Sequence, residues 1–127
     1  MIEKNKIPLS PGATIGILGG GQLGRMSALA AARLGFRCHI FTPENDSPAS
    51  QVASKTTVGN YDDQEALRSF ASESDVITYE FENIPLETAL FLEKLAPLYP
   101  NPTILAISQH RGSEKQFAID HGIEVAP

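Results

Sequence analysis

The sequence lacks tryptophan, and its 127 residues include only six phenylalanines and three tyrosines. So few aromatic side chains disfavour a surface on which nucleic-acid bases could stack. Ten basic residues stand against fifteen acidic ones, which leaves a net charge of −5 and no basic patch for general nucleic-acid binding. We therefore expect a protein that has no nucleic-acid partner.

Cysteine and long apolar runs are also scarce. Cys38 is the only cysteine, so the chain can form neither an internal disulfide nor a cysteine-based metal site. The longest apolar stretches, such as residues 28–32 and 104–107, are too short to span a membrane. Residues 1–6 lack the apolar core of a signal peptide. These absences predict a cytoplasmic protein with no membrane partner.

The remaining composition is that of an ordinary globular domain. Hydrophobic residues make up 42% of the chain and charged residues 20%. The length is typical of one domain. Residues 1–13 contain Pro8, Pro11 and Gly12 and show no periodicity, so we expect an N-terminal extension there. The folded domain is expected over residues 14–127.

Short β-branched and apolar segments alternate with helical segments along this domain. Such alternation predicts an α/β fold with a doubly wound parallel sheet of the Rossmann-like type. Right-handed crossovers then predict strand order 3-2-1-4-5, with helices on both faces of the sheet. The segments expected to be strands are residues 14–18, 36–42, 55–58 and 75–79, with a weak fifth strand at residues 98–99.

Capping residues and apolar periodicity locate the helices. Ser47 and Pro48 predict a short helix that reaches Ala53, and the Asp62-x-x-Glu65 pattern predicts a helix that ends near Ser72. Three further helices are expected: from residue 85 to before residue 97, over residues 103–109, and over residues 112–120. A helix is also predicted over residues 22–34, where the apolar residues at helical spacing are Leu23, Met26, Ala30 and Leu34.

A glycine-rich segment lies between the first predicted strand and the first predicted helix. Residues 19–24, Gly-Gly-Gly-Gln-Leu-Gly, fit the pattern G-x-G-x-x-G in the strand–helix context that this pattern requires. Glycines let the backbone approach an oxyanion, and the start of a helix supplies free N–H groups. The segment therefore predicts either a phosphate-binding turn or a tight turn without a ligand.

The second predicted strand does not end as a nicotinamide dinucleotide domain would require. Such a domain needs an acidic residue at that strand end to hold the ribose hydroxyls. Here the strand ends at Thr42-Pro43, and Glu44 follows only beyond the proline. An NAD(P)-binding regulatory domain stays an alternative, as does a structural or dimerising module.

Three motifs in order resemble the N-terminal domain of the N5-carboxyaminoimidazole ribonucleotide synthase family. They are Gly-Gly-Gly-Gln-Leu-Gly-Arg-Met at residues 19–26, Ser-Pro-Ala at 47–49 with Val-Ala at 52–53, and Thr-Tyr-Glu-Phe-Glu-Asn at 78–83. The resemblance extends to Arg111 and to Lys-Gln at residues 115–116. It covers about residues 14–127, which would form the pre-ATP-grasp, substrate-binding domain of that family.

The resemblance implies an ATP-grasp ligase of purine biosynthesis as the parent protein. Such an enzyme uses ATP, Mg²⁺ and bicarbonate to carboxylate 5-aminoimidazole ribonucleotide. The ATP-grasp and C-terminal domains, with the metal ligands, would lie outside this chain. We therefore expect a fragment that binds substrate and is inactive alone, from a parent that forms a homodimer.

The resemblance also implies a set of binding residues, with no catalytic residue among them. The substrate ribonucleotide would lie against the glycine-rich turn and the acidic residues after the fourth strand, and ATP would contact one arginine. The residues expected to bind substrate are Gly21, Gln22, Leu23, Glu80, Glu82 and Asn83, and the residue expected to bind ATP is Arg111.

Each of these side chains also has a plainer interpretation. Glu80 and Glu82 could be loop carboxylates, and they share one face only if their segment is extended. Asn83 could cap the helix that begins at Pro85. Arg111 could be a solvent-facing residue in the first turn of a helix.

Overall fold

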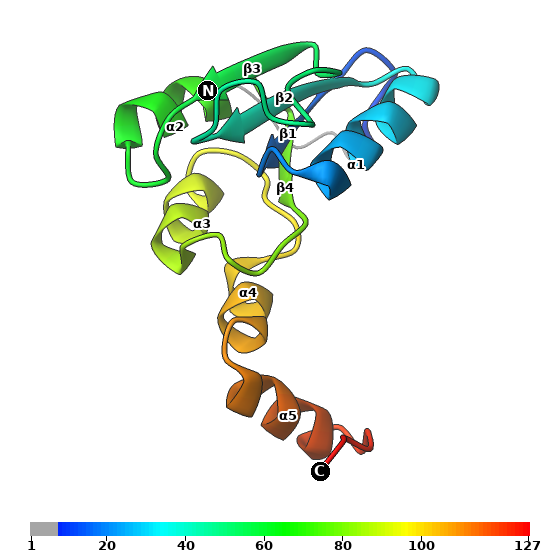
Figure 1. Ribbon diagram of the computed structural model, residues 1–127, viewed down its shortest axis with the longest axis vertical. Helices are drawn as coiled ribbons and strands as arrows, with labels where there is room; N and C mark the ends of the chain where they lie inside the picture. Colours follow the sequence, from blue (N-terminus) through cyan, green and yellow to red (C-terminus); the bar gives the residue numbers. More distant parts are fainter. Residues whose placement is uncertain (1–7) are drawn as a thin grey trace.

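A parallel sheet of four strands forms the centre of the computed structural model, which describes residues 8–127 (Figure 1). The expected N-terminal extension therefore lies partly outside the described residues. The strand order is β3-β2-β1-β4, which confirms the predicted order of the first four strands. The strands are β1 (Thr14–Leu18), β2 (Arg37–Thr42), β3 (Lys55–Val58) and β4 (Val76–Tyr79).

The predicted fifth strand is reduced to one bridge. Leu98 pairs in parallel with Ile77 of β4, so it occupies the predicted position at the sheet edge. The Ile77 N–H donates to the Pro97 carbonyl at 2.8 Å, and the Tyr99 N–H donates to the Ile77 carbonyl at 3.0 Å. Pro97 has no N–H to donate back to β4, so the ladder does not extend toward the start of that strand.

Helices cover both faces of the sheet, as the doubly wound topology predicts. One buried cluster, which includes Ile17 and Ile40, lies under α1, and a second, which includes Phe41 and Leu67, lies under α2 and α3. The helices are α1 (Gln22–Arg33), α2 (Gln64–Ser72), α3 (Leu86–Glu93), α4 (Pro102–Ser108) and α5 (Arg111–Asp120).

The predicted apolar face of α1 is not the face that contacts the sheet. Gly24, Ala28 and Ala31 are buried there instead. A Cβ atom on Gly24 would lie 2.9 Å from the Gly19 carbonyl oxygen, so the helix is too close to the sheet for large side chains. The large residues of the predicted face are left exposed: Leu23 by 56%, Met26 by 57% and Leu34 by 69%.

The helix predicted between Ser47 and Ala53 is a series of turns. The Ser50 hydroxyl donates to the Ser47 carbonyl at 2.7 Å, and the Ser47 hydroxyl accepts from the Ser50 N–H at 3.4 Å. The Ser47 hydroxyl thus caps the first turn as an N-cap residue would, but the chain continues as turns and not as a helix. The Arg25 guanidinium also donates to the Pro48 carbonyl, at 3.2 Å, and ties the segment to α1.

The cap of α2 lies one residue later than the sequence pattern indicated. Asp63, and not Asp62, is the N-cap, and its carboxylate accepts from the N–H groups of Glu65 and Ala66 at 3.1 and 3.0 Å. A carboxylate at this position satisfies backbone donors that the helix itself leaves free. The predicted end of the helix at Ser72 is confirmed.

The last two helices extend away from the sheet (Figure 1). Both occur within two residues of their predicted bounds. None of the residues of α5 is buried, and Phe117 and Ile119 are 40% and 53% exposed. The crevice described below is therefore built by the sheet and its loops.

The close contact between β1 and α2 gives a stability prediction. A Cβ atom on Gly16 would lie 2.5 Å from Ser74 Oγ and 2.7 Å from Phe70 Cζ. We expect Gly16→Ala to lower the free energy of unfolding by about 1–3 kcal/mol, because the added methyl group overpacks this face. Gly112→Ala is the control, since Gly112 lies in the first turn of α5 and its Cβ position has only ordinary contacts, at 3.4 Å, with His110. Equal urea midpoints for the two variants would contradict the prediction.

Candidate functional site

A crevice of about 420 Å³ lies at the carboxyl ends of the strands. Each of the four strands supplies part of its lining, because the loops that follow parallel strands meet at the same sheet edge. We call it the carboxyl-edge crevice; it is lined by residues 19–23, residues 42–44, Tyr61, Glu80 and Phe81. The lining thus combines the glycine-rich turn, the end of β2 and the start of the segment after β4.

The glycine-rich turn forms one wall of the crevice. Gly19 has a φ of +108°, and its N–H donates to the Phe41 carbonyl at 2.9 Å. Gly21 is the N-cap of α1 and has no side chain that could accept from the first turn of the helix. The free N–H groups at this helix start suit an acceptor on a ligand. Gln22 and Leu23, the first helical residues, also line the crevice.

Glu80 lies against this turn. A Cβ atom on Gly19 would lie 3.5 Å from Glu80 Oε1, so a side chain larger than hydrogen would bring the turn into contact with the carboxylate. Glu80 Oε2 is buried and has no hydrogen-bond partner among the described residues. Burial, and then the nearby charge of Glu82, raise the pKa of the Glu80 carboxyl above its ordinary value. The site thus presents an unsatisfied acceptor that a ligand N–H or O–H group would satisfy.

Tyr61 is a crevice residue that no motif in the sequence indicated. It follows β3, and the parallel sheet brings the carboxyl end of β3 to the same edge as those of the other strands. Burial, and then the charges of Glu44 and Glu80, raise the pKa of the Tyr61 hydroxyl to about 12. Tyr61 is therefore a protonated hydrogen-bond donor at neutral pH.

The other expected site residues are not gathered in this crevice. The chain bends and turns at residues 81–83 rather than staying extended, so the condition under which Glu80 and Glu82 share a face is not met. Glu82 lines a shallower hollow beside the crevice, together with Glu80 and Ile104. Asn83 is exposed and does not cap α3, whose N-cap is Pro85 with no side-chain hydrogen bond.

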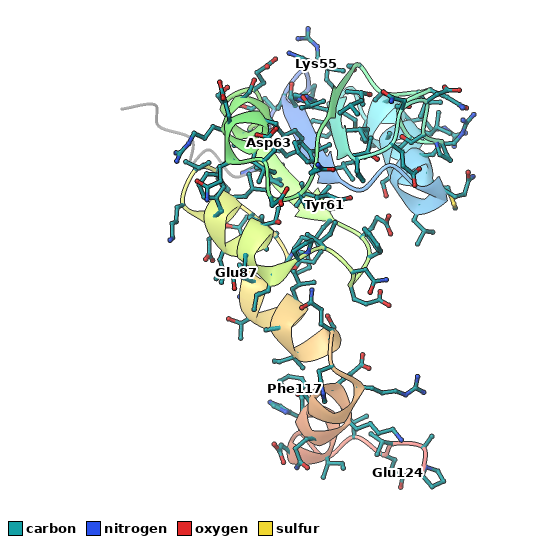
Figure 2. All side chains as sticks on the ribbon, turned by 60° about the vertical axis from the view of Figure 1, so that its left-hand side comes forward. Lys55, Tyr61, Asp63, Glu87, Phe117 and Glu124 are labelled. Carbon is teal, nitrogen blue, oxygen red and sulfur yellow. The ribbon has the colours of Figure 1, made fainter. Side chains whose placement is uncertain are left out.

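Arg111 begins α5 and is exposed. It does not line the carboxyl-edge crevice. Figure 2 shows the labelled Tyr61 close to the sheet and the labelled Phe117 of α5 far from it.

The crevice carries negative charge and no positive side chain. Its ionisable groups are Glu44, Tyr61 and Glu80. Within residues 8–127, no group of three or more His, Cys, Asp or Glu side chains could hold a metal ion. The described residues therefore do not fit a Mg²⁺ site. Nor do they include a helix with the length and hydropathy needed to cross a membrane.

Comparison with known families identifies the fold. Residues 12–109 match the family model described as the ribonucleotide synthetase preATP-grasp domain. The chain belongs to this family. This is the fold family that the ordered motifs of the sequence resembled.

Two similar proteins are named for the same activity. The chain is 54% identical over 123 residues to the N5-carboxyaminoimidazole ribonucleotide synthase of Brucella melitensis, a match that covers 97% of this chain and 34% of the relative. The crystal structure of an ADP complex of an N5-carboxyaminoimidazole ribonucleotide synthetase superposes with a TM-score of 0.89 at 45% identity, over 94% of this chain and 32% of that one.

A third similar protein was solved with two ligands. The Aspergillus clavatus N5-carboxyaminoimidazole synthase, in complex with ADP and 5-aminoimidazole ribonucleotide, has a TM-score of 0.81 at 28% identity, over 92% of this chain and 31% of that one. The chain thus spans about a third of the length of the proteins it matches.

The raised pKa of Glu80 gives a prediction about stability. The folded state holds the Glu80 proton more tightly than the unfolded state does, so stability falls as pH rises from the ordinary value of 4.5 through the raised pKa. The glutamine of Glu80→Gln does not ionise, so the variant does not lose stability in this way as the pH rises. We expect the ligand-free variant at pH 7 to melt at or above the temperature of the original chain.

The matched control is Glu93→Gln, which makes the same change at an exposed position of α3. Thermal melts between pH 4.5 and 7 would compare the three proteins. A clear loss of stability at pH 7 in Glu80→Gln alone would show that the carboxylate stabilises the fold. That result would contradict the interpretation that the unpartnered oxygen of Glu80 serves to bind a ligand.

Proposed function

We propose that residues 14–127 form the substrate-binding, pre-ATP-grasp domain of an N5-carboxyaminoimidazole ribonucleotide synthase. This ligase of purine biosynthesis would carboxylate 5-aminoimidazole ribonucleotide with ATP and bicarbonate. The observation that carries the proposal is the unpartnered, buried oxygen of Glu80 beside the glycine-rich turn. The 54% identity to the Brucella melitensis synthase supports the assignment of this crevice to that activity.

The crevice suits a ribonucleotide because it offers both kinds of hydrogen-bonding group. The glycine-rich turn supplies backbone donors from Gly21, Gln22 and Leu23, which fit oxygen acceptors. Glu80 supplies acceptors, which fit the hydrogens of hydroxyl and amino groups. The substrate has ribose hydroxyls, an amino group and a phosphate. Glu82 and Asn83 would contact it from the rim, beyond the turn that follows β4.

The remaining chemistry requires residues outside this chain. ATP would supply the phosphoryl group that activates bicarbonate, and the described residues offer no group that would hold Mg²⁺. Arg111 is the residue that we assign to ATP, since a guanidinium suits phosphate or base recognition. For the full-length protein we also propose an ATP-grasp architecture, a homodimer and a cytoplasmic location.

One observation favours an alternative function. Glu44 lines the crevice, and its N–H donates to Thr42 Oγ1 at 3.2 Å, so an acidic side chain is available at the end of β2. An NAD(P)-binding regulatory domain would use such a carboxylate for ribose hydroxyls. Thermal-shift measurements with NAD, ATP and 5-aminoimidazole ribonucleotide distinguish the two, because a ligand that binds the native state raises its melting temperature.

Glu80→Gln tests the proposed function in the full-length protein. The substitution keeps the size of the side chain and removes its charge and part of its acceptor capacity. Losing a hydrogen bond to a charged group costs about 1.5–3 kcal/mol, which corresponds to about a ten- to hundredfold loss of affinity for 5-aminoimidazole ribonucleotide. Isothermal titration would measure the two affinities.

Binding of ADP and the melting temperature serve as controls in the same titration, and Glu93→Gln is the matched variant. Unchanged ribonucleotide affinity in Glu80→Gln would mean that Glu80 is an ordinary loop carboxylate. A parallel loss of ADP binding and of stability would assign the defect to folding instead of to the crevice.

We further expect residues 1–127 alone to show no carboxylation activity. Positioning and electrostatic stabilisation supply most of the rate in phosphoryl transfer, and the described residues provide no metal site for it. Purified chain would be assayed for bicarbonate-dependent release of ADP from ATP in the presence of 5-aminoimidazole ribonucleotide. Activity that persists when the protein comes from a host with its own synthase inactivated would refute this expectation.

A further inference from the structure

Tyr61 places a hydrogen-bond donor in the carboxyl-edge crevice, near the acceptor that Glu80 provides. We propose that Tyr61 and Glu80 together recognise a sugar hydroxyl of the ribonucleotide, so that Tyr61 is a specificity-determining residue of the crevice. This inference rests on the proposed function and extends it from the substrate class to the group that the crevice recognises.

The position of Tyr61 is fixed by its surroundings. Its ring packs against Phe41, with the ring centroids 5.9 Å apart. Its backbone carbonyl accepts a hydrogen bond of 2.6 Å from the Thr88 hydroxyl of α3. The residue thus stands between the carboxyl-edge crevice and a second hollow of about 280 Å³ that Pro85 and Phe91 help to line. The Phe41 contact restrains the ring, and the Thr88 hydrogen bond restrains the backbone that carries it.

The hydroxyl of Tyr61 is free to bind a ligand. It has no hydrogen-bond partner among the described residues. Burial, and then the nearby charges of Glu44 and Glu80, raise the pKa of the Tyr61 hydroxyl, so it keeps its proton at neutral pH. Glu80 Oε2 is likewise unpartnered, and it is buried. The residues that line the crevice therefore include one with an unpaired donor and one with an unpaired acceptor.

A hydroxyl group on the ligand can pair with both the Tyr61 donor and the Glu80 acceptor. It can accept a hydrogen bond from Tyr61 and donate its own hydrogen to Glu80. A phosphate only accepts, and the carboxylates of Glu44 and Glu80 would repel it. An amino group on an aromatic ring mainly donates, so it would leave the Tyr61 hydroxyl unpaired. The pair therefore selects a sugar hydroxyl over the other polar groups of the substrate.

The test compares ligands within one protein variant. The full-length protein and its Tyr61→Phe variant would be titrated with 5-aminoimidazole ribonucleotide and with its 2′-deoxy and 3′-deoxy counterparts. Phenylalanine keeps the ring that packs on Phe41 and removes only the hydroxyl. Tyr99→Phe is the control, because Tyr99 is 54% exposed and does not line the crevice.

We expect Tyr61→Phe to bind the ribonucleotide about 2- to 10-fold more weakly, as for the loss of one neutral hydrogen bond. Binding of one deoxy counterpart should be unaffected by the substitution, because that ligand lacks the hydroxyl that Tyr61 contacts. The preference for ribose over that deoxyribose should therefore shrink in Tyr61→Phe and stay unchanged in Tyr99→Phe. A general folding defect weakens all three ligands alike and leaves the ratio unchanged.

Two results would overturn the inference. An unchanged ribose preference in Tyr61→Phe, whether affinity falls or not, shows that Tyr61 does not recognise a sugar hydroxyl while the proposed function stands. Failure of the unsubstituted full-length protein to bind 5-aminoimidazole ribonucleotide removes the proposed function and this inference together.

Discussion

The parallel direction of the four strands is the constraint on which the rest of this structure depends. Because β1, β2, β3 and β4 all run the same way, the loops after them meet at one edge. Residues far apart in the sequence, such as Gly19, Tyr61 and Glu80, therefore line one crevice. An antiparallel strand at any of these places would carry its following loop to the opposite edge.

Close approach of backbone elements is the second requirement, and small residues meet it. Gly19 lets the glycine-rich turn lie beside the Glu80 carboxylate, and Gly24 lets α1 lie close to the carbonyl of Gly19. Glu80 Oε2 is buried beside this turn without a partner. Such an unsatisfied group costs stability in the free protein, which is common where a site is built for a ligand.

Short-range patterns in the sequence predicted the strands, their order and the place of Glu80. They did not predict features that depend on contacts between segments distant in the sequence. Leu23 and Met26 have helical spacing, but the distance between α1 and the sheet admits only small residues. Ser47 and Pro48 begin a series of turns and not the predicted helix. Tyr61 is recognisable as a crevice residue only once β3 is known to lie beside β2 in the sheet.

The central claim is that a ribonucleotide lies between the glycine-rich turn and Glu80. The most direct test is a crystal structure of the full-length protein with 5-aminoimidazole ribonucleotide bound. Our account predicts that a ligand hydroxyl or amino group lies within hydrogen-bond distance of Glu80, about 3 Å, and that the ligand contacts residues 19–23. A ribonucleotide bound elsewhere, with Glu80 still unpartnered, would contradict it.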